Sequence, residues 1–200
     1  MTKVIKEMKN AVIGIAGLGG LGSNVAAALA RLGVGKLIMV DFDIVEESNL
    51  TRQQYFIDQI GMPKTEASLV NLTRINENIY IETQKIKLDP GNISQVFSKV
   101  DIVAECLDCA DQKQMLVETV LTKMEKVIVV SVSGLAGVGK SNAIITKRIS
   151  GRHVLVGDGE SDAILGTLLT ASRVGVAAYH QANAIAEIIT NGMNVPDFGS

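Results

Sequence analysis

The stretch that decides the fold runs from Ala11 to Ser23 and reads AVIGIAGLGGLGS. Residues 11–16 form an apolar run of strand length, and residues 23–32 are rich in alanine and leucine and end before Gly33. The first pattern is typical of a buried strand, and the second of a helix with a glycine C-cap. The stretch therefore predicts a strand, a tight turn and a helix. The turn contains four glycines, Gly17, Gly19, Gly20 and Gly22.

A second strand follows this helix and ends on an acid. Residues 36–41, KLIMVD, are mostly apolar up to Asp41, which lies nineteen residues after Gly22. The three elements form a βαβ unit, in which a glycine-rich turn can hold a phosphate on the free N–H groups of a helix N-terminus. A carboxylate at the end of the second strand can accept both hydroxyl protons of a ribose. The pattern predicts a nucleotide site, but it does not separate NAD from ATP.

The rest of the chain continues to alternate between strands and helices. Residues 127–132, VIVVSV, are almost all β-branched, the pattern of a strand buried on both faces. We expect one α/β domain over residues 1–200, with a Rossmann-like, mostly parallel sheet and helices on both faces, and with antiparallel pairing open for the later strands. Further strands are expected at 79–83, 102–106 and 142–149, and helices at 64–76, 93–98, 113–123 and 171–190.

Charge and composition exclude several classes of partner. Nineteen Lys and Arg stand against 21 Asp and Glu, and neither sign forms a long block. This balance argues against nucleic acid or an anionic membrane as the main partner. Residues 1–10 mix charges where a signal peptide would need an apolar run, and the apolar stretches are too short to span a bilayer. We therefore expect a soluble, cytoplasmic protein.

The two cysteines, Cys106 and Cys109, form a C-x-x-C pair. Two thiolates cannot complete a four-ligand zinc site, and His153 and His180 lie far away in the sequence, so we expect no zinc site. A redox pair is the alternative, and it requires the motif to open a helix after a strand.

A second glycine-rich segment satisfies the letters of the P-loop pattern. Residues 134–141 read GLAGVGKS, but a P-loop needs a helix to follow so that the phosphates sit on its N-terminus. Residues 142–149 are β-prone instead. We therefore prefer a glycine-rich connection between two strands.

The polar segment that follows the second strand carries the most specific pattern. Residues 41–53 read DFDIVEESNLTRQ, and Lys64 ends the motif GMPK. With the glycine turn, LDCAD at 107–111 and SVSG at 131–134, this sequence resembles the ThiF/MoeB/HesA family, the bacterial relatives of the ubiquitin-activating enzymes. The motifs cover most of the chain in the family's order. The resemblance implies a Rossmann-type domain that binds Mg-ATP.

The resemblance also implies roles for individual residues. Asp41 would hold the ATP ribose, and Asp111, which matches the second acid of the family's D-C-T-D-N segment, would bind Mg²⁺ with Asp108 nearby. A guanidinium and an ammonium are suited to clamp a triphosphate, and Mg²⁺ prefers one or two carboxylates plus phosphate oxygens. The predicted catalytic residues are Arg52, Lys64 and Asp111, and the predicted nucleotide-binding residues are Gly17, Gly19, Gly20, Gly22, Asp41, Asp43, Asn49, Arg52, Gln53 and Lys64.

The activity that the resemblance implies is adenylylation of the C-terminal carboxylate of a small ubiquitin-like sulfur carrier ending in Gly-Gly, with release of pyrophosphate. The short, zinc-less form looks most like a ThiF of thiamin biosynthesis, and the family implies a homodimer. Residues 151–166, rich in Gly and Asp, are expected to form a mobile loop over the carrier tail. Two other functions stay open: an NAD(P)-dependent oxidoreductase that uses the same glycine turn, and a non-catalytic ATP-binding module.

Overall fold

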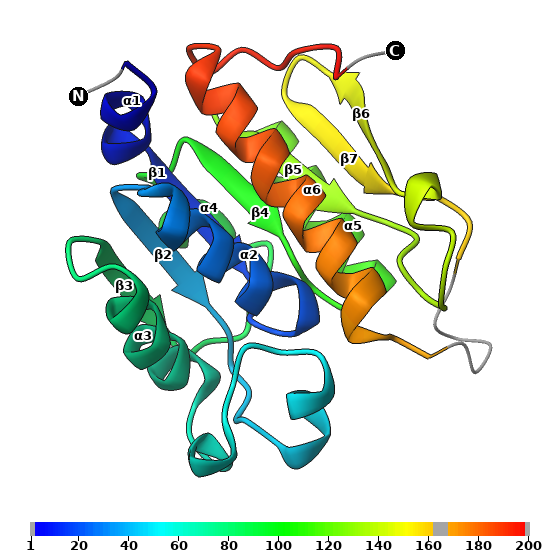
Figure 1. Ribbon diagram of the computed structural model, residues 1–200. Coiled ribbons are helices and arrows are strands. Elements are labelled where there is room, and N and C mark those ends of the chain that lie inside the picture. The colour runs from blue at the N-terminus through cyan, green and yellow to red at the C-terminus, as the bar shows by residue number, and fades with distance from the viewer. Residues whose placement is uncertain (1–2, 162–167, 199–200) are drawn as a thin grey trace.

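The protein is built on a seven-stranded sheet, seen in a computed structural model that describes residues 3–161 and 168–198 (Figure 1). The strands are β1 (Val12–Ala16), β2 (Lys36–Val40), β3 (Tyr80–Gln84), β4 (Ile102–Glu105), β5 (Ile128–Val132), β6 (Ile145–Ser150) and β7 (His153–Gly157). Their order across the sheet is β3-β2-β1-β4-β5-β7-β6. Neighbouring strands are parallel except for β6 and β7, which are antiparallel. The predicted Rossmann-like α/β fold is thus confirmed.

Helices cover both faces of the sheet. Figure 1 shows α2, α3 and α6 in front of the strands, with α4 and α5 behind them. The helices are α1 (Lys3–Asn10), α2 (Gly20–Leu32), α3 (Lys64–Ile75), α4 (Ile93–Val96), α5 (Ala110–Lys123) and α6 (Ala171–Thr190), and the short 3₁₀ helices are η1 (Glu47–Thr51), η2 (Ile57–Gln59) and η3 (Ser141–Ala143). No helix among the described residues combines the length and the apolar character needed to cross a bilayer.

The central strands are buried because both of their faces meet a helix layer. In β1, Ile13 and Ile15 are fully buried in the core under α2 and α6, while Gly14 faces the opposite layer. A Cβ atom at Gly14 would lie 2.6 Å from Cδ1 of Phe97, so the glycine makes room for that buried ring. The continuous apolar runs of the sequence follow from this two-sided burial.

Helix α1 and strand β7, like the short 3₁₀ helices, were not predicted from the sequence. Helix α1 was not predicted, because its alternation of charged and apolar residues buries Met8 alone. The expected mobile loop at 151–166 was wrong for 153–157, which form β7 beside β5, and residues 162–167 of that segment lie outside the described residues. The turn at Ser150-Gly151-Arg152 was a signal for a hairpin, and the pairing of β7 with β5 and β6 makes the segment a strand.

The P-loop look-alike connects strands, as predicted. Lys140 takes a left-handed backbone conformation (φ 48°), and the residues after it form only the three-residue η3 before β6 begins. The next element after η3 is strand β6 and not an α-helix, so the segment offers no α-helix N-terminus to a phosphate.

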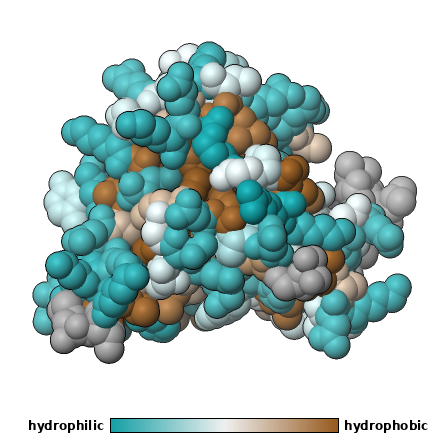
Figure 2. Space-filling view, turned by 90° about the horizontal axis from the view of Figure 1, so that it is seen from above, coloured by the Kyte–Doolittle hydropathy of each residue, from teal (hydrophilic) through white to brown (hydrophobic). Residues whose placement is uncertain are grey.

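The strands of the sheet run between two ends of the molecule, and the two ends carry different features. The parallel strands point away from the edge that carries both termini (Figure 1). Figure 2 looks onto that terminal edge, where hydrophilic residues form the outline and hydrophobic ones show through the middle. Scattered apolar side chains are ordinary on a protein surface. The carboxyl ends of the parallel strands, at the other edge, carry the candidate site.

Candidate nucleotide-binding site

A cavity of about 760 Å³ opens where the strand order reverses. From β1 the chain goes to β2 on one side, whereas β4 lies on its other side, so the carboxyl ends of β1 and β4 leave a crevice between their loops. Ligands of open α/β sheets bind at such a switch point. The volume falls in the range of small-molecule sites, roughly 300–1,000 Å³.

The glycine turn forms the floor of this cavity. Gly17 has a φ of +91°, and a Cβ atom there would lie 2.7 Å from the carbonyl oxygen of Cys106. At Gly22 a Cβ atom would lie 1.8 Å from the carbonyl oxygen of Gly17. Gly19 caps α2 without a side chain, and Gly17, Gly19 and Gly20 line the cavity, whereas Gly22 is needed for packing behind it. The first N–H groups of α2 thus lie beside the cavity, as anion binding requires.

Asp41 ties the glycine turn to the end of β2. It is 8% exposed, and its carboxylate accepts hydrogen bonds from the backbone N–H groups of Leu18, at 2.6 Å, and Asp43, at 2.8 Å. An ionised carboxylate has about four acceptor positions, so these two bonds leave room for others. Asp41 also lines the cavity, and a ribose would meet it there.

Two cations predicted to bind phosphate lie on the segment between β2 and α3. Lys64 is the first residue of α3, is 6% exposed, and its Nζ lies 2.9 Å from Oδ2 of Asp43. Arg52 lies past the end of η1, and its guanidinium donates to the carbonyl oxygen of Ser48 at 3.2 Å. Its Cγ and Cδ run close to Gly20 at the start of α2. Both cations line the cavity.

The amides of the same segment divide into two roles. Asn49 is buried, and its Oδ1 accepts from the backbone N–H of Glu46 at 3.0 Å, which fixes the start of η1. Gln53 is 9% exposed and lines the cavity, and its Oε1 has no hydrogen-bond partner among the described residues. Gln53 is thus the amide with unused hydrogen-bonding capacity.

The two predicted metal-binding acids lie on either side of the start of α5. Asp108 is exposed and lines the cavity, whereas Asp111, in the first turn of α5, is exposed and is not among the lining residues. Glu105 and Asp108 have the same three-residue spacing as Asp108 and Asp111, so spacing alone did not show which of these acids lines the cavity.

A magnesium ion bound with a nucleotide fits this donor set. Among residues 3–161 and 168–198, three or more His, Cys, Asp or Glu side chains nowhere gather into a cation site. Mg²⁺ is commonly held by one or two carboxylates together with the phosphates of its substrate. Asp108 beside the glycine turn offers the carboxylate that such an ion needs, and Asp111 lies one helical turn away.

One side of the cavity is apolar, and its residues were not predicted from the sequence. Val40, Phe42, Ile86, Leu88 and Leu107 line it next to Asp41. Their position at the strand ends suits a flat, largely apolar base adjoining a ribose. The signal for Ile86 and Leu88 was their alternation directly after β3, which extends the strand pattern without extending the strand.

Another wall of the cavity is held by a buried ion pair that was also missed. Arg173, in the first turn of α6, pairs with Asp158 and donates to the carbonyl oxygens of Gly139 and Lys140 at 2.6 and 3.0 Å. Asp158 accepts from Ser161 at 2.8 Å. These contacts bring together the two loops that line this wall, 134–136 and 159–161.

The loss of folding stability at acidic pH is expected to depend in part on the Asp158 carboxylate. Desolvation pushes its pKa upward, but hydrogen bonds from Ser161 and Glu160 and the charge of Arg173 outweigh this and lower the pKa from 3.8 to about 2. Because the folded-state pKa is depressed, the contribution is present above the unfolded value and is lost as the pH falls from about 4 to 2.

Urea denaturation at steps between pH 5 and pH 2 measures this contribution. The wild type should lose more stability over the window than Asp158→Asn does. Asp197→Asn is the matched control, since Asp197 is 79% exposed in a surface pair with Arg148, and it should follow the wild type. Parallel curves for the wild type and Asp158→Asn would contradict the assignment.

The C-x-x-C pair spans the junction between β4 and α5, the context that the redox alternative required. Cys106 is buried with its thiol 3.5 Å from Oε1 of Gln181, and Cys109 is exposed as the N-cap of α5. Burial raises the pKa of the Cys106 thiol, which disfavours its thiolate. Both cysteines are free, and the buried thiol is poorly suited to exchange.

Comparison with known proteins agrees with this geometry. Over 112 residues the chain is 39% identical to the molybdopterin-synthase adenylyltransferase of Haemophilus influenzae, covering 56% of this chain and 46% of that protein. It is 31% identical over 134 residues to the adenylyltransferase and sulfurtransferase UBA4 of Yarrowia lipolytica, covering 67% of this chain and 33% of that protein. The chain therefore spans less than half the length of these relatives.

The fold also matches that of solved structures. The E. coli tRNA N6-threonylcarbamoyladenosine dehydratase TcdA, solved in complex with AMP, superposes with a TM-score of 0.85 at 20% identity, covering 96% of this chain and 90% of that one. At this identity the likeness concerns the fold alone. Residues 2–161 match the model of the ThiF family. The resemblance expected from the sequence is confirmed, and the chain belongs to the ThiF family.

Proposed function

We propose that this protein is a Mg-ATP-dependent adenylyltransferase that activates the C-terminal carboxylate of a small ubiquitin-like sulfur carrier. The observation that carries the proposal is a single cavity in which the glycine turn, Asp41, Arg52 and Lys64 meet. A dinucleotide needs the first two features but has little use for two cations beside the phosphate site. Two relatives named as adenylyltransferases, each at least 31% identical over the aligned part, support the same activity.

Different lining residues would bind the base, the ribose and the phosphates of the nucleotide. The base would lie on the apolar side between Phe42 and Leu107, and the ribose would lie on Asp41. The phosphates would then extend over the N-terminus of α2 toward Arg52 and Lys64, where N–H groups and two cations oppose their charge. In this order the α-phosphorus would lie near the centre of the cavity.

The carrier's carboxylate would attack that phosphorus and form an acyl adenylate, with pyrophosphate as the leaving group. No general base is needed, because a carboxylate is already ionised at neutral pH. Arg52 and Lys64 would stabilise the negative charge that moves toward the pyrophosphate. Asp108, with Asp111 as the second candidate from the sequence, would hold a Mg²⁺ ion that neutralises phosphate charge when bound. The remaining proposed nucleotide contacts are Asp43, Asn49 and Gln53.

The acceptor enters from the side of residues 134–136 and 159–161, where the lining is mainly neutral. A tail ending in Gly-Gly would reach the cavity in extended form. Thiamin biosynthesis is the first pathway to test, and a molybdopterin-type carrier is the second, since one relative is named a molybdopterin-synthase adenylyltransferase. The proposal includes a homodimer, as the family resemblance implies.

The deciding experiment is ATP–pyrophosphate exchange with Mg²⁺, in the presence and absence of sulfur carriers ending in Gly-Gly. We expect exchange that depends on the carrier and falls by about 10-fold or more in Arg52→Ala, since one positioned charge contact to the phosphates is lost. Arg31→Ala is the matched control, because Arg31 is exposed at the far end of α2.

Three other results would redirect the proposal. No exchange with any carrier, together with tight NAD binding, would establish the oxidoreductase. ATP binding without exchange would identify a non-catalytic module. Exchange that Arg52→Ala leaves intact would retain adenylylation but remove Arg52 from the phosphate clamp.

A further inference from the structure

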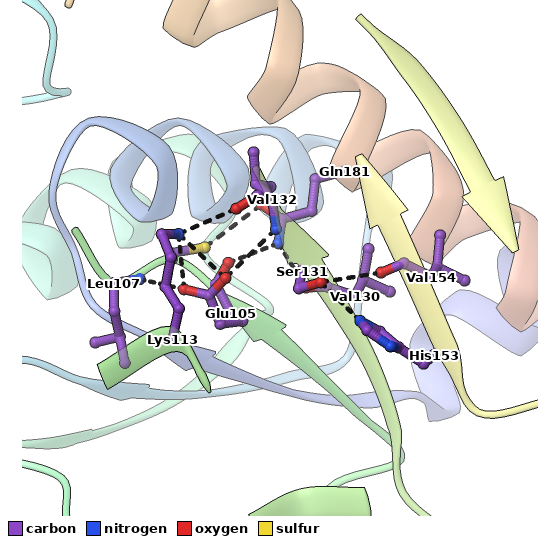
Figure 3. Close-up of polar contacts among 10 residues, drawn as sticks. Glu105, Leu107, Lys113, Val130, Ser131, Val132, His153, Val154 and Gln181 are labelled. Carbon is purple, nitrogen blue, oxygen red and sulfur yellow. Dashed lines mark hydrogen bonds and ion pairs between the residues drawn. The ribbon is translucent and has the colours of Figure 1, made fainter. Parts of the chain in front are cut away.

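A fully buried carboxylate lies at the end of β4, directly beside the cavity. Glu105 is the last residue of the strand and is 0% exposed. Its carboxylate accepts from the backbone N–H of Leu107 at 2.8 Å and from the backbone N–H of Val132 at 3.4 Å. Burial of an ionised carboxylate is costly unless partners satisfy it. The residues around Glu105 supply those partners (Figure 3).

The principal partner is an ammonium from the next helix. Nζ of Lys113, in α5, lies 3.0 and 3.1 Å from the two carboxylate oxygens of Glu105, and it also donates to the carbonyl oxygen of Val132 at 3.2 Å. Lys113 is 23% exposed and lines the cavity. One ammonium thus joins the carboxyl ends of β4 and β5 to α5, as Figure 3 shows.

The main chain at the same point is held independently. Gln181, fully buried in α6, donates through Nε2 to the carbonyl oxygens of Glu105 and Val130 at 3.0 and 2.8 Å. Its Oε1 lies 3.5 Å from the thiol of Cys106. Helices from both faces of the sheet therefore fix the last residue of β4. Glu105 pairs with Ala16 of β1 but lies beyond the last pair between β4 and β5, Ala104 with Val130, so Gln181 holds the two strands together where their ladder ends.

The segment that this network fixes is the one that carries Asp108. The hydrogen bond from Leu107 to the Glu105 side chain closes a turn immediately before Asp108, and Lys113 lies just over one helical turn beyond it. The same turn packs on the phosphate-binding floor, since Gly17 leaves only enough room for the carbonyl oxygen of Cys106. The Glu105–Lys113 pair thus restrains the chain on both sides of Asp108.

We propose that Glu105 and Lys113 are positioning residues for the Asp108 carboxylate, and that they set how strongly Mg²⁺ and ATP reinforce each other's binding. The inference rests on the proposed use of Mg-ATP but not on the adenylylation step. Groups that orient a metal ligand from behind typically change metal affinity 10–100-fold when they are removed. Neither residue touches the nucleotide in this scheme.

The test is the ratio of the ATP dissociation constants in EDTA and in Mg²⁺, measured by calorimetry. Removing Lys113 alone would leave a buried charge unpaired, so the decisive variant is Glu105→Met/Lys113→Met, which removes both charges and the acceptor of the Leu107 N–H. We expect its ratio to fall about 10-fold from the wild type, with the EDTA value little changed. Asp108→Asn should lower the ratio in the same way.

The matched control is Glu105→Gln/Lys113→Met, which also removes both charges but keeps an oxygen that can accept from Leu107. It keeps one of the two restraints on the turn, so its ratio should lie between those of the wild type and of Glu105→Met/Lys113→Met, and melting curves should show both double variants to be folded. A folded Glu105→Met/Lys113→Met protein with the wild-type ratio would overturn the proposal, as would a wild-type ratio of one. Failure of pyrophosphate exchange in the wild type would instead count against adenylylation alone.

Discussion

Replacing Lys64 by Met is expected to slow carrier-dependent pyrophosphate exchange by about 10²- to 10³-fold at saturating Mg-ATP. The ammonium of Lys64 is nearly buried at the start of α3 and lies 2.9 Å from Asp43, so it is a positioned charge and not a mobile one. Its loss would remove a cation from the phosphates and leave the Asp43 carboxylate without its partner. Both changes act against the charge that develops on the departing pyrophosphate.

The matched control for this prediction is Lys126→Met. Lys126 is exposed in the turn before β5 and does not line the cavity, so its loss should leave exchange within about twofold of the wild type. Initial rates over a range of ATP concentrations separate kcat from KM. An exchange rate for Lys64→Met equal to that of the control would remove Lys64 from the catalytic group and leave it a structural partner of Asp43.

Replacing Arg173 by Met is expected to destabilise the fold by about 3–5 kcal/mol. The side chain is 4% exposed and pairs with Asp158, whose side chain is 12% exposed. The substitution would leave that carboxylate unpaired and strip the carbonyl oxygens of Gly139 and Lys140 of their donor. Urea denaturation at neutral pH measures the loss as a lower midpoint.

A second Arg-to-Met substitution provides the control. Arg148 and Asp197 form an ion pair of similar chemistry at 3.1 Å, but their side chains are 43% and 79% exposed. Solvent-exposed pairs contribute about 0–1 kcal/mol, so Arg148→Met should change stability little. Equal losses in the two variants would show that burial does not distinguish the pairs. The ATP dissociation constant of Arg173→Met, measured at a temperature where the variant is folded, would then show whether this wall contributes to nucleotide binding.

Features of the fold and of the site that produce a local sequence pattern could be predicted from the sequence. The glycine turn, the strand that ends on Asp41 and the long helix at 171–190 follow from periodicity, glycine spacing and caps, and each lies where it was predicted. The cation-bearing segment came from the family resemblance, and the structure places Arg52 and Lys64 on the same cavity as the glycine turn. Their roles in phosphate binding stay predictions.

The parts that were missed depend on contacts between residues far apart in the chain. Glu105 resembles any acid at a strand end, and only its burial against Lys113 and Val132 distinguishes it. Arg173 at the start of α6 opposes the usual charge preference of a helix N-terminus, so a local rule predicts against it. Its carboxylate partner lies fifteen residues earlier, in the loop directly after β7. No periodicity reports such pairs.

The position of β7 between β5 and β6 has a consequence for how the protein folds. β6 precedes β7 in the chain, yet it touches the sheet only through β7. The two strands therefore join as a hairpin, by a local step, and that hairpin must dock on β5 as one piece. Both loops of the cavity wall adjoin one end of this hairpin, since residues 134–136 precede β6, residues 159–161 follow β7, and Ile145 pairs with Gly157. The ligand cavity is therefore complete only when this hairpin and the start of α6 are in place beside the glycine turn, which lies far earlier in the chain.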